Sequence, residues 1–315
     1  MSATAPVSKM TSTAEVPAAV SQATSEEPRV PLLVRGWHAV TFAVRALGDA
    51  FGAFRRARRR ERVALALLLL RMRAKQFVMK LSPSRKFQSE TVFCWTLQCL
   101  DYNSFAFFVE EVFVRGDYEF CSRAEKPLIL DCGSNIGLAL FFFKHRYPQA
   151  RIVAFEACRV AFEKLTENVK VNRLQDVKLH HVALSSSSGL AEFYEDSAAP
   201  GSAKNSLFPG RGGDRLQVVP IAPLSQFIEE PVDLLKLDIE GAEETVLAEL
   251  VASGRLALVR QLVMEYHHHI LPGQDRLSHT LRILEENGFG YEFRETPPPA
   301  SPGGFQDLLI HAYRK

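Results

Sequence analysis

Short apolar runs alternate with longer amphipathic segments over the second half of the chain. The runs that have the length of buried strands lie at 128–131, 151–155, 177–182, 231–238, 261–266, 290–295 and 306–313. The segments with helical periodicity lie at 137–147, 159–171, 242–253 and 276–287. This alternation predicts an α/β fold with a mostly parallel sheet and helices on both of its faces.

An insertion separates the third and fourth predicted strands. It contains two strand-like runs, Ala191–Glu195 and Leu216–Ile221, joined by a loop over 196–214 that is rich in Gly, Ser and Pro. Long loops of this kind on a rigid sheet often close over ligands, so we expect this one to influence the choice of substrate.

The N-terminal part has a different pattern. Residues 1–30 are rich in Ala, Ser, Thr and Pro, which predicts a disordered tail. Residues 32–80 have helical character, and we assign 31–112 to a basic helical N-terminal extension. The apolar run over 63–70 is far shorter than the roughly 20 residues that cross a bilayer, so no transmembrane helix is expected.

Charge is divided unevenly between this extension and the rest of the chain. The segment from Arg29 to Lys86 holds 15 Lys or Arg and two acids, about +13, so a net charge of +2 leaves about −11 for the remainder. The extension either lies on an anionic membrane or packs on a partner subunit, for example in a homo-oligomer, or on its own chain. Nucleic acid is not expected, because the acidic body would repel phosphates.

The cysteine content indicates free thiols in a reducing compartment. The five cysteines are odd in number and form no CxxC pair, and no secretory signal precedes them. We therefore expect a cytoplasmic protein, with peripheral membrane contact through the basic extension as a hypothesis.

The first predicted strand leads into the turn Asp131-Cys-Gly-Ser-Asn-Ile-Gly137 and then a helix. Gly133 lets a ligand approach the backbone, and Asn135 tolerates a left-handed conformation. The helix N-terminus supplies free N–H groups. An ordinary strand–turn–helix corner would have the same local pattern, so the turn alone does not establish a ligand site.

The second predicted strand ends at Glu156, whose carboxylate can accept both hydroxyls of a ribose. The turn lacks the G-x-G-x-x-G spacing that dinucleotides require. Its leading acid, Asp131, disfavours a pyrophosphate but suits an amine, such as that of the methionyl end of S-adenosylmethionine. The sequence therefore favours a nucleoside site over a dinucleotide site.

A third group of acids follows the fourth predicted strand, in Leu234-Leu-Lys-Leu-Asp-Ile-Glu-Gly-Ala-Glu-Glu244. Glu243 and Glu244 can be explained by a favourable interaction with the dipole of the next helix. Asp238 and Glu240 precede that helix and lie where open parallel sheets bind ligands, so helix capping does not explain them.

Several segments, in order, resemble the FkbM family of class I methyltransferases from about residue 113 to the C-terminus. They are Asp131–Gly137, Ala154-Phe-Glu156, Asn168-x3-Asn172, Val182-Ala-Leu-Ser185, Leu235–Glu243 and Glu265-Tyr-His267. The resemblance implies a Rossmann-like, seven-stranded, mostly parallel sheet over 113–315, and an S-adenosylmethionine-dependent O-methyltransferase.

The resemblance also implies which residues contact the cofactor. Glu156 holds the ribose, Asp238 lies near the sulfonium, and Tyr118 covers the cofactor. The positions assigned to the methionyl part and to the remaining contacts are Asp131, Gly133, Ser134, Asn135, Gly137, Ala157 and Ala183. Two of these depart from the family pattern, since Ala157 replaces a usual Pro and Ser134 a usual Ala; neither change removes a contact group.

Methyl transfer to oxygen requires alignment of the acceptor and often removal of a proton. Glu240, Glu243 and His267 are the candidate catalytic residues; a neutral His267 suits proton removal near pH 7, although it could equally bond only a loop. Zinc is not expected, since no Cys or His pair has ligand spacing, and we assign no metal ligand. A divalent cation between Asp238, Glu240 and an acceptor diol remains an alternative.

Three functions are compatible with this pattern. The first is an active methyltransferase that acts on a hydroxyl of a sugar, glycan, lipid or secondary metabolite. The second is a methyltransferase-like domain that acts as a non-catalytic binding or scaffold protein, although the intact motifs argue against it. The third is a nicotinamide-dependent oxidoreductase, which the turn pattern disfavours.

Overall fold

The computed structural model describes residues 42–315 except 43, 45, 53, 56, 57, 210, 271–275 and 295–303. The chain divides into two compact units, Met1–Ala43 and Val44–Lys315, and nearly all described residues belong to the second. The tail expected over 1–30 lies outside the described residues. None of the helices in the described ranges is long and apolar enough to cross a membrane.

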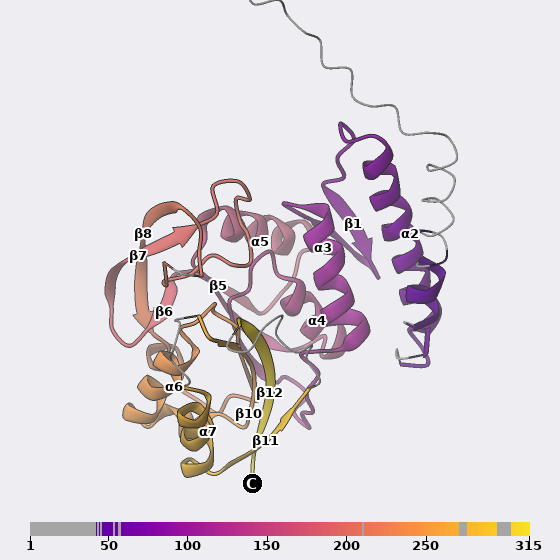
Figure 1. The fold of residues 1–315 in the computed structure, drawn as a ribbon. Coiled ribbons are helices and arrows are strands. Elements are labelled where there is room, and N and C mark those ends of the chain that lie inside the picture. The colour runs from indigo at the N-terminus through magenta and orange to yellow at the C-terminus, as the bar shows by residue number, and fades with distance from the viewer. Residues whose placement is uncertain are drawn as a thin grey trace, which may run out of the picture. The chain divides into compact units, whose positions relative to one another are not determined.

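A seven-stranded sheet with the order β11-β12-β10-β9-β3-β4-β5 lies at the centre of the second unit (Figure 1). Its strands are β3 (Leu128–Cys132), β4 (Arg151–Glu156), β5 (Val177–His181), β9 (Leu234–Leu237), β10 (Gln261–His268), β11 (Phe289–Phe293) and β12 (Gln306–Arg314). The strands from β10 to β5 run parallel, and β12 is antiparallel to both of its neighbours. The predicted fold class and the number of strands are confirmed.

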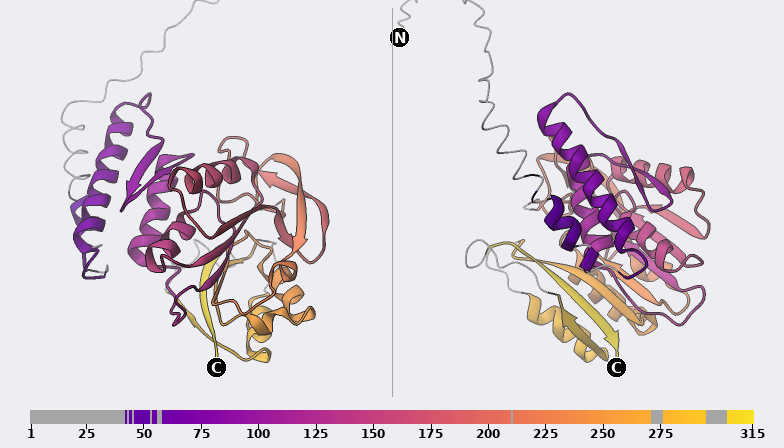
Figure 2. Two further views of the ribbon diagram at one scale, coloured as in Figure 1. Left: turned by 180° about the vertical axis from the view of Figure 1, so that it is seen from behind. Right: turned by 90° about the vertical axis from the view of Figure 1, so that its right-hand side faces the viewer.

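Helices cover both faces of this sheet because successive strand residues point to opposite sides. Ile129 of β3 packs in one core with α4 (Leu138–Arg146) and α5 (Arg159–Val171). Leu130, the next residue, packs in the other core with α6 (Glu243–Ala252) and α7 (Leu277–Glu286). Figures 1 and 2 show the two helix layers on either side of the strands.

The predicted insertion forms a small sheet of its own, in the order β6-β8-β7. Its strands are β6 (Ala183–Ser185), β7 (Gly189–Glu195) and β8 (Arg215–Pro223). The loop between β7 and β8 is tied back to the body, because the Asn135 side-chain amide donates to the Gly201 carbonyl at 3.3 Å. The insertion thereby borders the end of the central sheet where a ligand would bind.

The N-terminal extension is not helical throughout, which corrects the sequence-based prediction. Between α2 (Arg62–Leu81) and α3 (Tyr102–Val109) lies an antiparallel hairpin of β1 (Ser89–Val92) and β2 (Trp95–Gln98). Alternate residues of β1 are buried, as a strand with one buried face requires. A six-residue π-helical segment, Glu110–Arg115, continues α3.

Helix α2 packs on the body of its own chain, which was one of the alternatives for the basic extension. Its apolar face buries Leu65, Leu68, Leu69 and Met72 in the core that also contains α4 of the body. An ion pair joins the extension to the body, with Arg58 3.0 Å from Glu119, and Arg73 lies 2.7 Å from Glu110 within the extension. Part of the positive charge of the extension is therefore paired within the molecule.

Candidate active site

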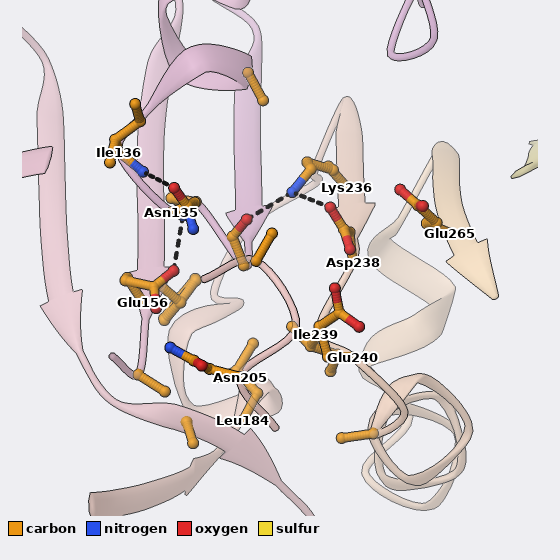
Figure 3. Close-up of a pocket in the computed structure, with 18 of the residues that line it drawn as sticks. Asn135, Ile136, Glu156, Leu184, Asn205, Lys236, Asp238, Ile239, Glu240 and Glu265 are labelled. Atoms are coloured by element: carbon orange, nitrogen blue, oxygen red, sulfur yellow. Dashed lines mark hydrogen bonds and ion pairs between the residues drawn. The ribbon is translucent and has the colours of Figure 1, made fainter. Parts of the chain in front are cut away.

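A pocket lies at the carboxyl ends of β3, β4 and β9, where the strand order reverses (Figure 3). Polar groups on its wall come from the turn after β3, from the end of β4 and from the segment after β9. Apolar side chains from α3, α4 and the insertion complete it. Phe155 and Ala157 at the end of β4, and Ala183 and Leu184 of the insertion, are among its apolar residues.

The turn after β3 has a backbone that only specific residues tolerate. Gly133 has φ +81°, and a Cβ there would lie 1.7 Å from the carbonyl oxygen of Asp238. Asn135 has φ +47°, in the left-handed region that Asn adopts more readily than most residues. Gly137, at φ +99°, precedes α4, and its missing side chain leaves room for Leu165. The turn therefore brings main-chain groups close to the pocket wall.

Glu156, the last residue of β4, is fixed by main-chain N–H groups. Its carboxylate accepts hydrogen bonds from the Asn135 N–H at 2.7 Å and from the Cys158 N–H at 2.8 Å. Burial nevertheless raises the pKa of Glu156 to about 7. The carboxylate lines the pocket with acceptor capacity left over, as a contact with ribose hydroxyls requires.

Lys236 lies at the centre of the site, although its role was not predicted from the sequence. The ammonium group donates to the Gly133 carbonyl at 2.8 Å and lies 3.2 Å from Asp238 Oδ2 and 3.4 Å from Asp131 Oδ1. A lysine within an otherwise apolar strand, two residues before an aspartate, was the available signal. Burial disfavours its charge, but Asp238 and Asp131 outweigh that effect and raise the pKa of Lys236.

Asp238 connects Lys236 to the outer part of the site (Figure 3). The Tyr118 hydroxyl donates to Asp238 Oδ2 at 3.1 Å and lies 3.5 Å from Glu265 Oε2. Burial opposes ionisation of Asp238, but Lys236 and His267 outweigh it and lower its pKa. Burial and the charge of Asp238 raise the pKa of Glu265 well above its ordinary value.

His267, near the end of β10, is held between two glutamates. Its Nδ1 lies 2.9 Å from Glu243 Oε1, and its Nε2 lies 3.2 Å from Glu240 Oε2. Burial disfavours the charged imidazole, but Glu243 and Glu240 outweigh it and raise the pKa of His267 well above 6.5. A charged imidazole cannot take up a proton, so this geometry argues against His267 as a simple base near pH 7.

Glu243 has a structural task in addition to its contact with His267. Its Oε1 accepts hydrogen bonds from the main-chain N–H groups of Ile239 and Gly241, at 3.1 and 3.0 Å. These bonds fix the segment after β9, in which Glu240 has φ +55°. The explanation as a helix-capping acid therefore holds in part for Glu243 and does not apply to Glu240.

The structure brings the predicted site residues together at one end of the sheet, but not all of them line the pocket. Those that line it are Tyr118, Gly133, Ser134, Asn135, Glu156, Ala157, Ala183, Asp238 and Glu240. Four others lie behind this lining: Asp131, Gly137, Glu243 and His267. Sequence reasoning assigned no role to Lys236, Asn205 or Arg211, all of which contribute to the site.

One buried polar atom of the pocket lining has no protein partner, which fits a polar ligand. Within the described part of the chain, Nδ2 of Asn205 makes no hydrogen bond, whereas Asp131 behind the lining is paired with Lys236. Buried polar groups rarely remain unpaired without a ligand or water. Together with Glu156 and the apolar wall at Phe155 and Leu184, Asn205 gives the pocket the mixed polar and apolar lining that a nucleoside requires.

Pocket, sheet order and polar groups thus define a nucleoside-binding protein of the doubly wound α/β class. The sequence profile of the methyltransferase FkbM domain matches residues 131–291, about half of the chain. The chain belongs to the FkbM methyltransferase family, and its cofactor is S-adenosylmethionine. The resemblance recognised from the sequence motifs is confirmed.

Individual relatives agree with this membership. Methyltransferase sdnD of Sordaria araneosa is 32% identical over 191 residues, which cover 50% of this chain and 73% of that protein. Methyltransferase 1 of Beauveria bassiana is 27% identical over 229 residues, which cover 65% of this chain and 88% of that protein. The protein is therefore a methyltransferase.

A solved structure of lower similarity is methyltransferase FkbM from Methylobacillus flagellatus KT. It is 16% identical with a TM-score of 0.45, and the match covers 91% of this chain. The chain spans 63% of the length of that protein, a little under two thirds.

Proposed function

We propose that the protein transfers a methyl group to a hydroxyl oxygen of a sugar, lipid or secondary metabolite. The observation that carries this proposal is the cluster of Asp238, Glu240 and His267 beside the nucleoside pocket. An oxygen acceptor must be oriented and must lose a proton, and this cluster supplies groups for both tasks.

We assign the cofactor side of the pocket as follows. Glu156 accepts the ribose hydroxyls, and the adenine lies against the apolar wall that contains Ala157 and Ala183. The turn from Asp131 to Gly137, with Lys236, holds the amino acid part. S-adenosylmethionine supplies an electrophilic methyl carbon on a sulfonium, and Asp238 lies near that end of the site.

On the acceptor side, Glu240 is the group that we expect to contact the hydroxyl. It lines the pocket, whereas Glu243 and His267 lie behind it. As the acceptor oxygen forms its bond to the methyl carbon, the carbon–sulfur bond breaks, its electron pair stays on sulfur, and the hydroxyl proton passes to the Glu240 carboxylate. His267 and Glu243 are then positioning residues.

The test of this function is a methyl-transfer assay with labelled S-adenosylmethionine and a panel of hydroxylated sugars, lipids and metabolites. The panel includes amine and thiol analogues of any acceptor that reacts. We expect label on oxygen and loss of the label with Glu240→Gln. Transfer to an amine or thiol in preference to the matching alcohol would contradict the proposal, and binding of cofactor without any transfer would support a non-catalytic role.

We further propose that the extension makes peripheral contact with anionic membranes. The support is a set of exposed apolar side chains, Leu47, Phe51, Val63 and Leu67, close in sequence to a basic segment. Vesicles that contain phosphatidylserine should co-float the protein, and Leu47→Ser with Phe51→Ser should reduce flotation. Equal flotation of the two proteins would contradict this proposal.

A further inference from the structure

Acidic and imidazole groups from separate segments converge on one point beside the proposed acceptor site. Asp238 and Glu240 follow β9, and Figure 3 shows both on the side of the pocket away from Glu156. His267 comes from the neighbouring strand β10, and Asp307 is its cross-strand partner on β12. The Nε2 atom of His267 lies 3.2, 3.9 and 3.8 Å from oxygens of Glu240, Asp238 and Asp307.

The hydrogen bond of Nδ1 of His267 determines the tautomer of the neutral imidazole. Glu243 Oε1 lies 2.9 Å from Nδ1 and already accepts two main-chain hydrogen bonds. Nδ1 therefore carries a proton, and in the neutral imidazole Nε2 presents a lone pair. A carboxylate bonded to the far nitrogen is the arrangement that orients histidine as a metal ligand.

The Nε2 atom of His267 points into a group of carboxylates. The His267 side chain is only 1% exposed, and its Nε2 makes no hydrogen bond within the described residues. Oδ1 of Asp307 is also buried and makes no hydrogen bond within these residues. Three carboxylates around one nitrogen repel one another and its lone pair unless a positive centre, either a proton on Nε2 or a cation, lies between them.

We propose that Asp238, Glu240 and His267, with Asp307 as a fourth ligand, bind a divalent cation of the Mg²⁺ or Mn²⁺ kind. Such ions bind oxygen and imidazole ligands at about 2.0–2.2 Å, which places neighbouring ligand atoms about 3–4 Å apart. One ligand atom from each of Asp238, Glu240 and His267 already lies within 4.8 Å of the others. Asp307 belongs to a second such group, with Glu265 and His267, so the two groups share His267.

Carboxyl groups outnumber cationic side chains at this point. Two cations pair with the acids: Lys236 with Asp238 and Arg211 with Glu240. The acids that share this space with them are Asp238, Glu240, Glu243, Glu265 and Asp307. A divalent cation there would lower the repulsion among those carboxyl groups that are ionised.

The cation deepens the proposed function by naming a chemical class of acceptor. Protein ligands would fill four positions of an octahedral ion, which leaves two positions for other ligands. A vicinal diol or a hydroxy acid fills both, and coordination lowers the pKa of the reacting hydroxyl. Glu240 then gives Oε2 to the cation and keeps Oε1 for the proton. This role rests on the proposed O-methylation, whereas cation binding itself does not.

The experiment is a titration of the full chain with Mn²⁺, in which the electron paramagnetic resonance signal of free Mn²⁺ reports binding. Two variants remove ligands, Asp307→Asn and His267→Gln. The control is Asp176→Asn, which removes an exposed aspartate at the opposite end of the strands, next to the start of β5. Circular dichroism checks that each variant folds, and calorimetry with S-adenosylmethionine in EDTA is run in parallel.

We expect one tight Mn²⁺ site in the natural chain and the control, competition by Mg²⁺, and at least about tenfold weaker binding in a folded ligand variant. Absence of stoichiometric Mn²⁺ binding in the natural chain, or equal binding in both ligand variants and the control, would overturn the proposal. Cofactor binding in EDTA without Mn²⁺ binding would remove the cation site and leave the proposed function. Mn²⁺ binding without cofactor binding would leave the cation site and contradict the proposed function.

Discussion

The two sides of the pocket are built in different ways. The proposed cofactor side consists of the turn after β3 and the end of β4, where Glu156 is held by main-chain N–H groups. The proposed acceptor side consists of side chains from three segments, with His267 held by Glu243 and facing Glu240 and Asp307. Backbone geometry governs the first, and electrostatic balance among side chains governs the second.

The two sides should therefore respond differently to substitutions. On the cofactor side, a substitution that disturbs the main chain should remove binding. On the acceptor side, isosteric replacement of a charged group should change turnover and leave cofactor binding intact. The following changes test that separation.

The largest effect is expected for Gly133→Ala. A Cβ at this position would lie 1.7 Å from the Asp238 carbonyl oxygen, at a φ of +81°. We expect the free energy of unfolding to fall by about 3 kcal/mol or more and cofactor binding to be lost. Gly254→Ala is the matched control, because its φ is +73° and no atom lies within 4 Å of its added Cβ. A urea titration that finds equal losses would show that steric overlap is unimportant.

The next largest effect is expected for Glu240→Gln. Removal of the proposed proton acceptor should lower kcat by about 10²–10⁴-fold. The affinity for S-adenosylmethionine should change by less than about twofold, since the variant leaves the cofactor-side turn and Glu156 intact. Steady-state kinetics with calorimetry separates the two quantities. A parallel loss of cofactor affinity would contradict the division of the pocket into two sides.

A smaller effect is expected for Glu156→Gln. The amide retains the shape of the side chain but loses the charge that strengthens hydrogen bonds to ribose hydroxyls, so affinity should fall by about 10–100-fold. Glu163→Gln, on the exposed face of α5, is the control. Calorimetry that shows unchanged affinity in Glu156→Gln would remove the ribose assignment.

The smallest effect concerns pH. Burial raises the pKa of Glu156 to about 7, so this group takes up a proton as the pH falls through that value. Protonation removes the charged acceptor, and cofactor affinity should decline below pH 7 by up to about tenfold per pH unit. Calorimetry over a range of about pH 5.5 to 8.5, which brackets the pKa of this buried carboxyl, should show the decline in the natural chain only. An identical decline in Glu156→Gln would assign it to another group.

The geometry of the turn after β3 and of Glu156 follows from the sequence more directly than that of the acidic cluster around His267, for physical reasons. The turn at Gly133 and Asn135 is encoded locally, since few residues adopt a left-handed backbone there. Glu156 follows from its place at the end of a strand. The contacts of Lys236, Arg211 and Asp307 depend on strand order and on segments far apart in the chain, which no local pattern specifies.

The extension shows the same limit. Its helical periodicity predicted α2. The alternation in β1 spans only four residues, which is too short to distinguish a strand from the helical pattern around it. The sequence left open whether α2 packs on a membrane, a partner subunit or its own chain. Tertiary contacts decide this, such as the contact of Leu65 with the core of the body.

The most direct test of the account is calorimetry of S-adenosylmethionine with the natural chain, Glu156→Gln and His267→Gln. The account predicts binding to the natural chain, a clear loss of affinity in Glu156→Gln and little change in His267→Gln. Absence of binding to the natural chain, or equal losses in the two variants, would contradict the claim that a backbone-built cofactor side operates independently of the acceptor side.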